Sequence, residues 1–108
     1  MSKKSNPKSL FGRRLREARL RIGIAQDKLG VLIGMDESCS SARISRYETG
    51  VHEPPIAIVE KIATALKLPL PYFYCEDDVL AELIVIYDSL NDSQKNNVLA
   101  YVKGFSHC

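Results

Sequence analysis

Apolar residues recur at helical spacing along most of the chain. Phe11, Leu15, Ala18 and Ile22, for example, are four, three and four positions apart, which is the stripe of an amphipathic helix. Glycine, proline and capping residues interrupt the pattern at intervals and indicate where helices begin and end. The pattern predicts an all-α protein: a five-helix domain followed by two carboxy-terminal helices. The expected helices cover residues 9–22, 26–33, 40–49, 55–66, a short helix from Pro71, 77–90 and 92–103.

The same spacing predicts which side chains are buried. In the second helix these are Leu29, Leu32 and Ile33, and in the short fifth helix Phe73 and Tyr74. Gly30 lies inside the second helix, where glycine costs about 1 kcal/mol relative to alanine. Its missing side chain makes sense if another helix crosses closely at that point.

The apolar surface of the helix at 77–90 is wider than one stripe. One face is expected on the core of the chain, and the other needs the last helix or a second subunit to cover it. The sequence therefore predicts a homodimer that forms through the last two helices. Its expected interface residues are Leu80, Leu83, Ile84, Tyr87, Val98, Tyr101, Val102 and Phe105.

The helix expected at residues 40–49 has an unusual outward face. Ile44 and Tyr47 fall on one side and can pack on a core, while Gly50 ends the helix. The other side is small and polar with one long cation, and Arg43 stands at its edge. Such a face can enter the major groove of DNA, where small residues permit close approach and arginine can bind guanine or phosphate; the alternative is a solvated surface helix. The outward residues are Ala42, Ser45, Arg46 and Thr49.

Charge is divided unevenly along the chain, whose formal net charge is +2. Residues 1–50 hold 11 Lys/Arg against 5 Asp/Glu, whereas residues 51–108 hold 4 against 8. A basic half that contains the expected recognition helix favours a polyanion partner. The acidic half is expected to point away from it. The resulting division is a flexible basic arm at 1–8, a DNA-binding domain at 9–75 and a dimerisation segment at 76–108.

Other features limit the cellular setting. No apolar run approaches the ~18 residues of a membrane span, and no apolar segment follows the amino-terminal lysines as in a signal peptide. Cys39, Cys75 and Cys108 are odd in number and far apart, which fits reduced thiols rather than a disulfide framework. We therefore expect a cytoplasmic protein without membrane association.

Three segments together resemble the phage-repressor-like (Cro-type, or XRE) helix-turn-helix family: LREARLRIGIAQDKLGVLIG, ARISRYETGVHEPP and IVEKIATALKLPLPYFY. The resemblance implies that the third helix lies in the major groove of double-stranded DNA while the second crosses the backbone. With its two carboxy-terminal helices, the chain is also similar to the homodimeric controller proteins of restriction–modification systems. The matching positions imply a phosphate contact at Gln26, a structural pair of Arg19 and Glu48, and base-facing residues at Ser41, Ala42 and Arg46, with Arg43 beside them.

The chain departs from the family pattern in two places. Ala25 stands where a Ser or Thr usually caps the second helix, and the loss of that cap costs about 1 kcal/mol. Nine residues separate Gly34 from Ile44, about four more than in the family, which is roughly one helical turn. If they were helical, Glu37 would point inward, so the third helix is expected to start between Ser38 and Ser40.

Together these features predict a sequence-specific transcriptional regulator. As a homodimer it would bind a pseudo-palindrome with half-sites ~34 Å apart. The expected base contacts are Ser41, Ala42, Arg43, Ser45 and Arg46. The expected phosphate contacts are Gln26, Lys28, Arg13, Arg14 and Ser40.

An enzyme is not expected. His52 lies in a connection and His107 at the end of the chain, and no catalytic triad or phosphate-binding glycine loop is present. No cofactor or small-molecule ligand is evident. Cys75, His107 and Cys108 include no CxxC pair, so no metal site is expected.

Two further roles are compatible with the sequence. The apolar face of the sixth helix could instead bind a partner protein, as in an antitoxin. Cys39, near the start of the third helix and in the basic half, could act as a redox sensor.

Overall fold

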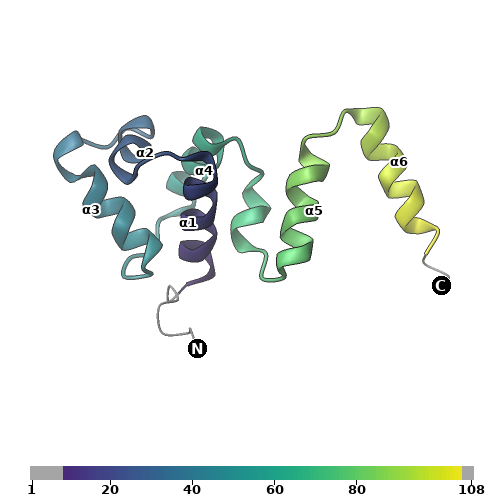
Figure 1. The fold of residues 1–108 in the computed structure, drawn as a ribbon, viewed down its shortest axis with the longest axis horizontal. Helices are drawn as coiled ribbons and strands as arrows, with labels where there is room; N and C mark the ends of the chain where they lie inside the picture. Colours follow the sequence, from purple (N-terminus) through teal and green to yellow (C-terminus); the bar gives the residue numbers. More distant parts are fainter. Residues whose placement is uncertain (1–8, 106–108) are drawn as a thin grey trace.

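The computed structural model describes residues 9–105, and all of its regular elements are helical, which confirms the predicted all-α class. The predicted arm at 1–8 lies outside the described residues. Helices α2 and α3 lie at one end of the molecule, α1 and α4 lie next to them, and α5 and α6 extend toward the other end (Figure 1). They are α1 (Leu10–Ile22), α2 (Gln26–Leu32), α3 (Glu37–Glu48), α4 (Ile56–Leu66), the 3-10 helix η2 (Leu70–Tyr74), α5 (Asp78–Asp88) and α6 (Asp92–Lys103).

Helix α1 begins and ends as its residues predict. The Ser9 hydroxyl accepts the backbone N–H of Gly12 at 2.9 Å, and Gly23 ends the helix with a φ of 81°. The expected burial of Ile22 is wrong, because its side chain is 53% exposed. The chain turns at Gly23, and Ile24 packs against the core in its place.

The core lies between α1, α2, α3, α4 and η2. Its fully enclosed side chains include Leu15 from α1, Ile44 from α3 and Ile62 from α4. From η2, Tyr72 and Phe73 are buried. The dense packing of these helices fixes α3 on one side of the molecule and the start of α5 on another.

Two further predicted core residues are exposed. Tyr74 is 46% exposed, because residues three apart share a face of a 3-10 helix and Pro71 of that face is exposed as well. Leu32 is 63% exposed, since α2 ends there and Leu29 and Ile33, four positions apart, form its inward face.

Helices α5 and α6 extend away from the core and open from each other (Figure 1). Ala81 is buried and Ile84 and Val85 pack partly on the core. Helix α6 starts with the predicted capping box of Asn91 and Gln94. Within the described residues α6 packs extensively on no other element. The radius of gyration of 16.0 Å accordingly exceeds the ~13 Å of a compact chain of this length.

Candidate nucleic-acid interface

Helices α2 and α3 cross at Gly30 and Ser40. A Cβ atom on Gly30 would overlap the hydroxyl of Ser40 and lie 2.8 Å from its Cβ, so the close crossing expected from Gly30 is present. Ser40 is fully buried and its hydroxyl donates to the Asp27 carbonyl at 2.6 Å. The prediction that Ser40 contacts phosphate is therefore wrong: its hydroxyl fastens α3 to α2.

The outward face of α3 carries the predicted base-contacting residues together. Ile44 and Tyr47 are buried on the inner side, which orients the helix. The Tyr47 side chain also raises the pKa of neighbouring Arg43 above its ordinary value. On the outer side Ser45 is half-buried, and the exposed residues are Ser41, Ala42, Arg43, Arg46 and Thr49.

Helix α3 starts one to three residues earlier than expected. It begins at Glu37, and its N-cap is Asp36, whose carboxylate accepts the Ser38 backbone N–H at 3.0 Å. Hydrogen bonds from the Ser38 hydroxyl and then its N–H lower the pKa of Asp36. Glu37 is exposed rather than inward, so the objection to an earlier start does not apply. The additional residues lengthen the helix rather than the turn, and Ser38 is an exposed residue of its first turn.

Gln26 lies at the start of α2 and links it to α3. Its amide Nε2 donates to Glu48 at 3.1 Å, and its amide oxygen accepts the Ser41 hydroxyl at 3.3 Å. Ala25 provides no side-chain cap, as its type implies. Gln26 is half-buried and its contact with Ser41 places it at the edge of the α3 face, while Lys28 is exposed on α2.

A buried ion pair connects α1 to the end of α3. Arg19 Nε and Nη2 lie 2.5 and 3.2 Å from the two Glu48 carboxylate oxygens, and Nη1 donates to the Ile24 carbonyl at 3.0 Å. Close to it, a Cβ on Gly12 would overlap the Glu48 carbonyl, so α1 and α3 cross in direct backbone contact. The inclination of α3 is thus fixed at both ends.

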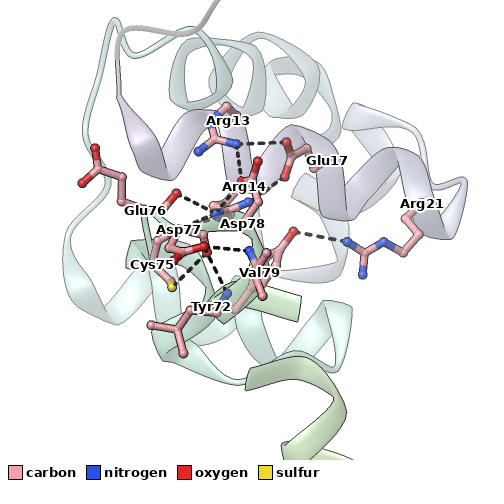
Figure 2. Close-up of polar contacts among 11 residues, drawn as sticks. Arg13, Arg14, Glu17, Arg21, Tyr72, Cys75, Glu76, Asp77, Asp78 and Val79 are labelled. Carbon is pink, nitrogen blue, oxygen red and sulfur yellow. Dashed lines mark hydrogen bonds and ion pairs between the residues drawn. The ribbon is translucent and has the colours of Figure 1, made fainter. Parts of the chain in front are cut away.

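The structure corrects the predicted role of Arg14. Its side chain is 3% exposed and donates to the Cys75 carbonyl, so it is not available to phosphate (Figure 2). Arg13 is half-buried, and its Nη1 atom lies 3.2 Å from Glu17 and 3.1 Å from Asp78. The positive charge of Arg13 is therefore already paired within the chain. The helical pattern gives a signal for Arg14, which stands three positions after Phe11 and four before Ala18 and so lies on the apolar side of α1. It gives none for Arg13, whose partner Asp78 comes from a distant segment.

Other kinds of site receive no support from the described residues. Among residues 9–105 no three His, Cys, Asp or Glu side chains are grouped to hold a metal ion. His107 and Cys108 lie outside this range. None of the helices described is both long and apolar enough to cross a membrane.

Comparisons with known proteins bear on this arrangement. Residues 10–71 match a family model described as a helix-turn-helix domain. The chain belongs to this helix-turn-helix family. Its fold is also similar to the crystal structure of transcriptional regulator BswR, with a TM-score of 0.82 and 41% identity over 86% of this chain and 92% of that one. Among curated proteins no significant match is found. The predicted resemblance to helix-turn-helix regulators is confirmed.

Proposed function

We propose that this helix-turn-helix protein is a sequence-specific transcriptional regulator that binds double-stranded DNA as a homodimer. The observation that carries the proposal is the outward face of α3, where Ala42 and Arg46 are exposed on a helix held from behind by Ile44 and by the Arg19–Glu48 pair. A rigid helix with small residues and a free guanidinium fits the major groove. The likeness to a known transcriptional regulator supports the same conclusion.

In this proposal α3 contacts the bases and α2 contacts the phosphates. Arg46 and Arg43 read base edges, and Ser41, Ala42 and Ser45 allow close approach to the bases. Gln26 and Lys28 contact phosphates from α2 and set the register of α3 in the groove. A role on DNA would place the protein in the cytoplasm with the chromosome.

The surface of α5 and α6 supports a second copy of the chain as partner. An apolar hollow of about 470 Å³ lies among the η2 segment and these two helices, lined by Pro69 and Pro71 as well as by Leu83, Tyr87 and Val98. Leu80, Tyr101, Val102 and Phe105 add further exposed apolar surface. A two-fold interface needs one patch that complements itself, and two open helix pairs that interlock would bury both hollows. Two α3 helices would then reach half-sites about one turn of DNA apart on a pseudo-palindrome.

Selection of bound sites from random duplexes tests the DNA-binding proposal. A purified chain that enriches a palindromic sequence supports it. A chain that ignores duplexes at low ionic strength overturns it, because phosphate contacts alone should then give binding.

Sedimentation tests the dimer. Val102→Glu and Leu83→Glu should each yield monomers because they place a charge in the interface, whereas Ile56→Glu, at a 55% exposed position on α4, should leave the dimer intact.

A role as an antitoxin would use the same exposed face of α5 and α6 and predicts a different result. A partner-dependent chain would aggregate alone and be rescued by co-expression with the neighbouring gene product. A soluble dimer in isolation favours the regulator.

A further inference from the structure

The chain between the DNA-binding domain and α5 passes through a short joint, residues 75–77, and Arg14 holds that joint. Arg14 Nε and Nη2 donate to the Cys75 carbonyl at 2.9 and 2.7 Å, and Nη2 also donates to the Glu76 carbonyl at 3.2 Å. Figure 2 shows these contacts converging on one guanidinium. Nη1 donates to Glu17 at 3.1 Å, which fixes the guanidinium against its own helix.

The first turn of α5 is bound to the same group. Asp78 Oδ1 lies 3.0 Å from Arg14 Nη2 and 3.1 Å from Arg13 Nη1 (Figure 2). Asp77 is the N-cap of α5, and its carboxylate accepts the Val79 N–H at 2.9 Å. This hydrogen bond ties the joint to the first turn of the helix. The direction in which α5 leaves the domain is therefore defined by contacts to α1.

An arginine is suited to this position for a geometric reason. Its planar fork presents several donors in fixed directions, so it can satisfy two carbonyls and two carboxylates at once. The Tyr72 ring lies 5.5 Å from its guanidinium carbon and covers it. Glu17 and Asp78 are exposed, so their ion pairs with Arg14 contribute little to stability by themselves. Because Arg14 binds the joint and the first turn of α5 together, its contacts are better suited to fixing the orientation of α5 relative to α1.

Helix α1 carries a second clamp five residues further on. Arg14 holds the start of α5, and Arg19 holds Glu48 at the end of α3. At ~1.5 Å rise per residue the two clamps are about 7.5 Å apart along a single helix. Apart from the joint, α5 meets the domain mainly through one face that contains Ala81. Both α3 and α5 are therefore held to α1, and these contacts to α1 fix the angle between them.

We propose that Arg14, acting through Asp78 and the carbonyls of the joint, is the positioning residue that sets the spacing of DNA half-sites. This rests on the proposed function, in which α3 reads the half-site and α5 with α6 forms the dimer. The angle between α3 and α5 then determines the distance between the two recognition helices. A change of one base pair in spacing moves a half-site by ~3.4 Å and rotates it by about 35°. A dimer whose α3–α5 angle is fixed cannot place both recognition helices on half-sites with the altered spacing.

The test measures the affinity of the full chain for its selected operator and for versions with one or two base pairs inserted or removed between the half-sites. Asp78→Asn removes the charge at a side chain that is 75% exposed, and Arg14→Lys keeps the charge but removes the fork. Glu82→Gln, at an exposed position of the same helix, is the matched control. We expect the affinity ratio between the best and the altered spacings to fall about threefold in Asp78→Asn, the range of one exposed ion pair. A larger fall is expected in Arg14→Lys, and none in the control.

Sedimentation of the same samples separates the two proposals. If the unmodified chain is a monomer on its operator, the dimer of the proposed function fails and the inference with it. If the dimer forms and Asp78→Asn keeps the original spacing preference, the inference is overturned and the proposed function stands. Asp78→Asn decides between these outcomes even if Arg14→Lys does not fold, because the Asp78 side chain is on the surface.

Discussion

Arg19 on α1 and Glu48 at the end of α3 form a two-point ion pair, with nitrogen–oxygen distances of 2.5 and 3.2 Å. Glu48 is 2% exposed and Arg19 8%. Gln26 donates to the same carboxylate, so one buried acid joins three helices of the DNA-binding domain. The pair explains why a helix with an almost wholly polar outer face keeps one orientation.

Replacing one partner of this pair should destabilise the fold. Glu48→Gln leaves the Arg19 guanidinium buried without a counter-charge, which typically costs about 3 kcal/mol or more. The free energy of unfolding from urea titration measures the loss. Combining it with Arg19→Met should cost much less than the sum of the single changes, because no unpaired charge remains. A single-variant loss below about 1 kcal/mol would contradict this role of the pair.

Gly30→Ala should also destabilise the domain, although alanine favours helices by about 1 kcal/mol. The added Cβ would overlap the Ser40 hydroxyl at the α2–α3 crossing, and overpacking typically costs about 1–3 kcal/mol. Thermal unfolding measures the net effect. Adding Ser40→Ala should recover part of the loss, since the overlapping oxygen is then absent. A more stable Gly30→Ala would show that the crossing relaxes freely.

Arg46→Ala and Lys28→Ala should differ in the kind of DNA binding they lose. A good bidentate contact to guanine discriminates by about 1–3 kcal/mol, so Arg46→Ala should relax preference at one operator position. Lys28→Ala should weaken all duplexes alike and lower the salt slope by about one. Competition binding at several salt concentrations measures both. An unchanged operator preference in Arg46→Ala would refute its assignment to base reading.

Asp78 should contribute to the acid dependence of stability. Its pKa is lowered from an ordinary value of 3.8 by hydrogen bonds from Arg13 first and then Arg14. A carboxylate whose pKa is lower in the folded state stabilises the fold above its unfolded pKa, and the effect is lost as the pH falls through the folded pKa. The stability difference between the unmodified chain and Asp78→Asn should therefore be constant above about pH 5 and shrink below about pH 4. Urea titrations from pH 3 to 6 test this, with Glu82→Gln as the control.

The order of the helices could be predicted from the sequence because it depends on local chemistry. The stripe of Phe11, Leu15 and Ala18, the Ser9 cap and the Asn91–Gln94 capping box are each read within a few residues. The same local periodicity placed Ala42 and Arg46 opposite Ile44. The wrong boundary at α3 came from treating Glu37 as inward, which depends on how the helix lies on its neighbours and not on its own period.

The sequence by itself determined the helices, the polar outer face of α3 and the excess of apolar residues in α5 and α6, since composition and periodicity carry that information. Only the tertiary structure decided which polar side chains are free. Arg14 and Ser40 have the same types as residues exposed to solvent, yet one binds the Cys75 carbonyl and the other Asp27. The partners of a buried polar group come from distant segments, and their convergence in space is a property of the packed fold.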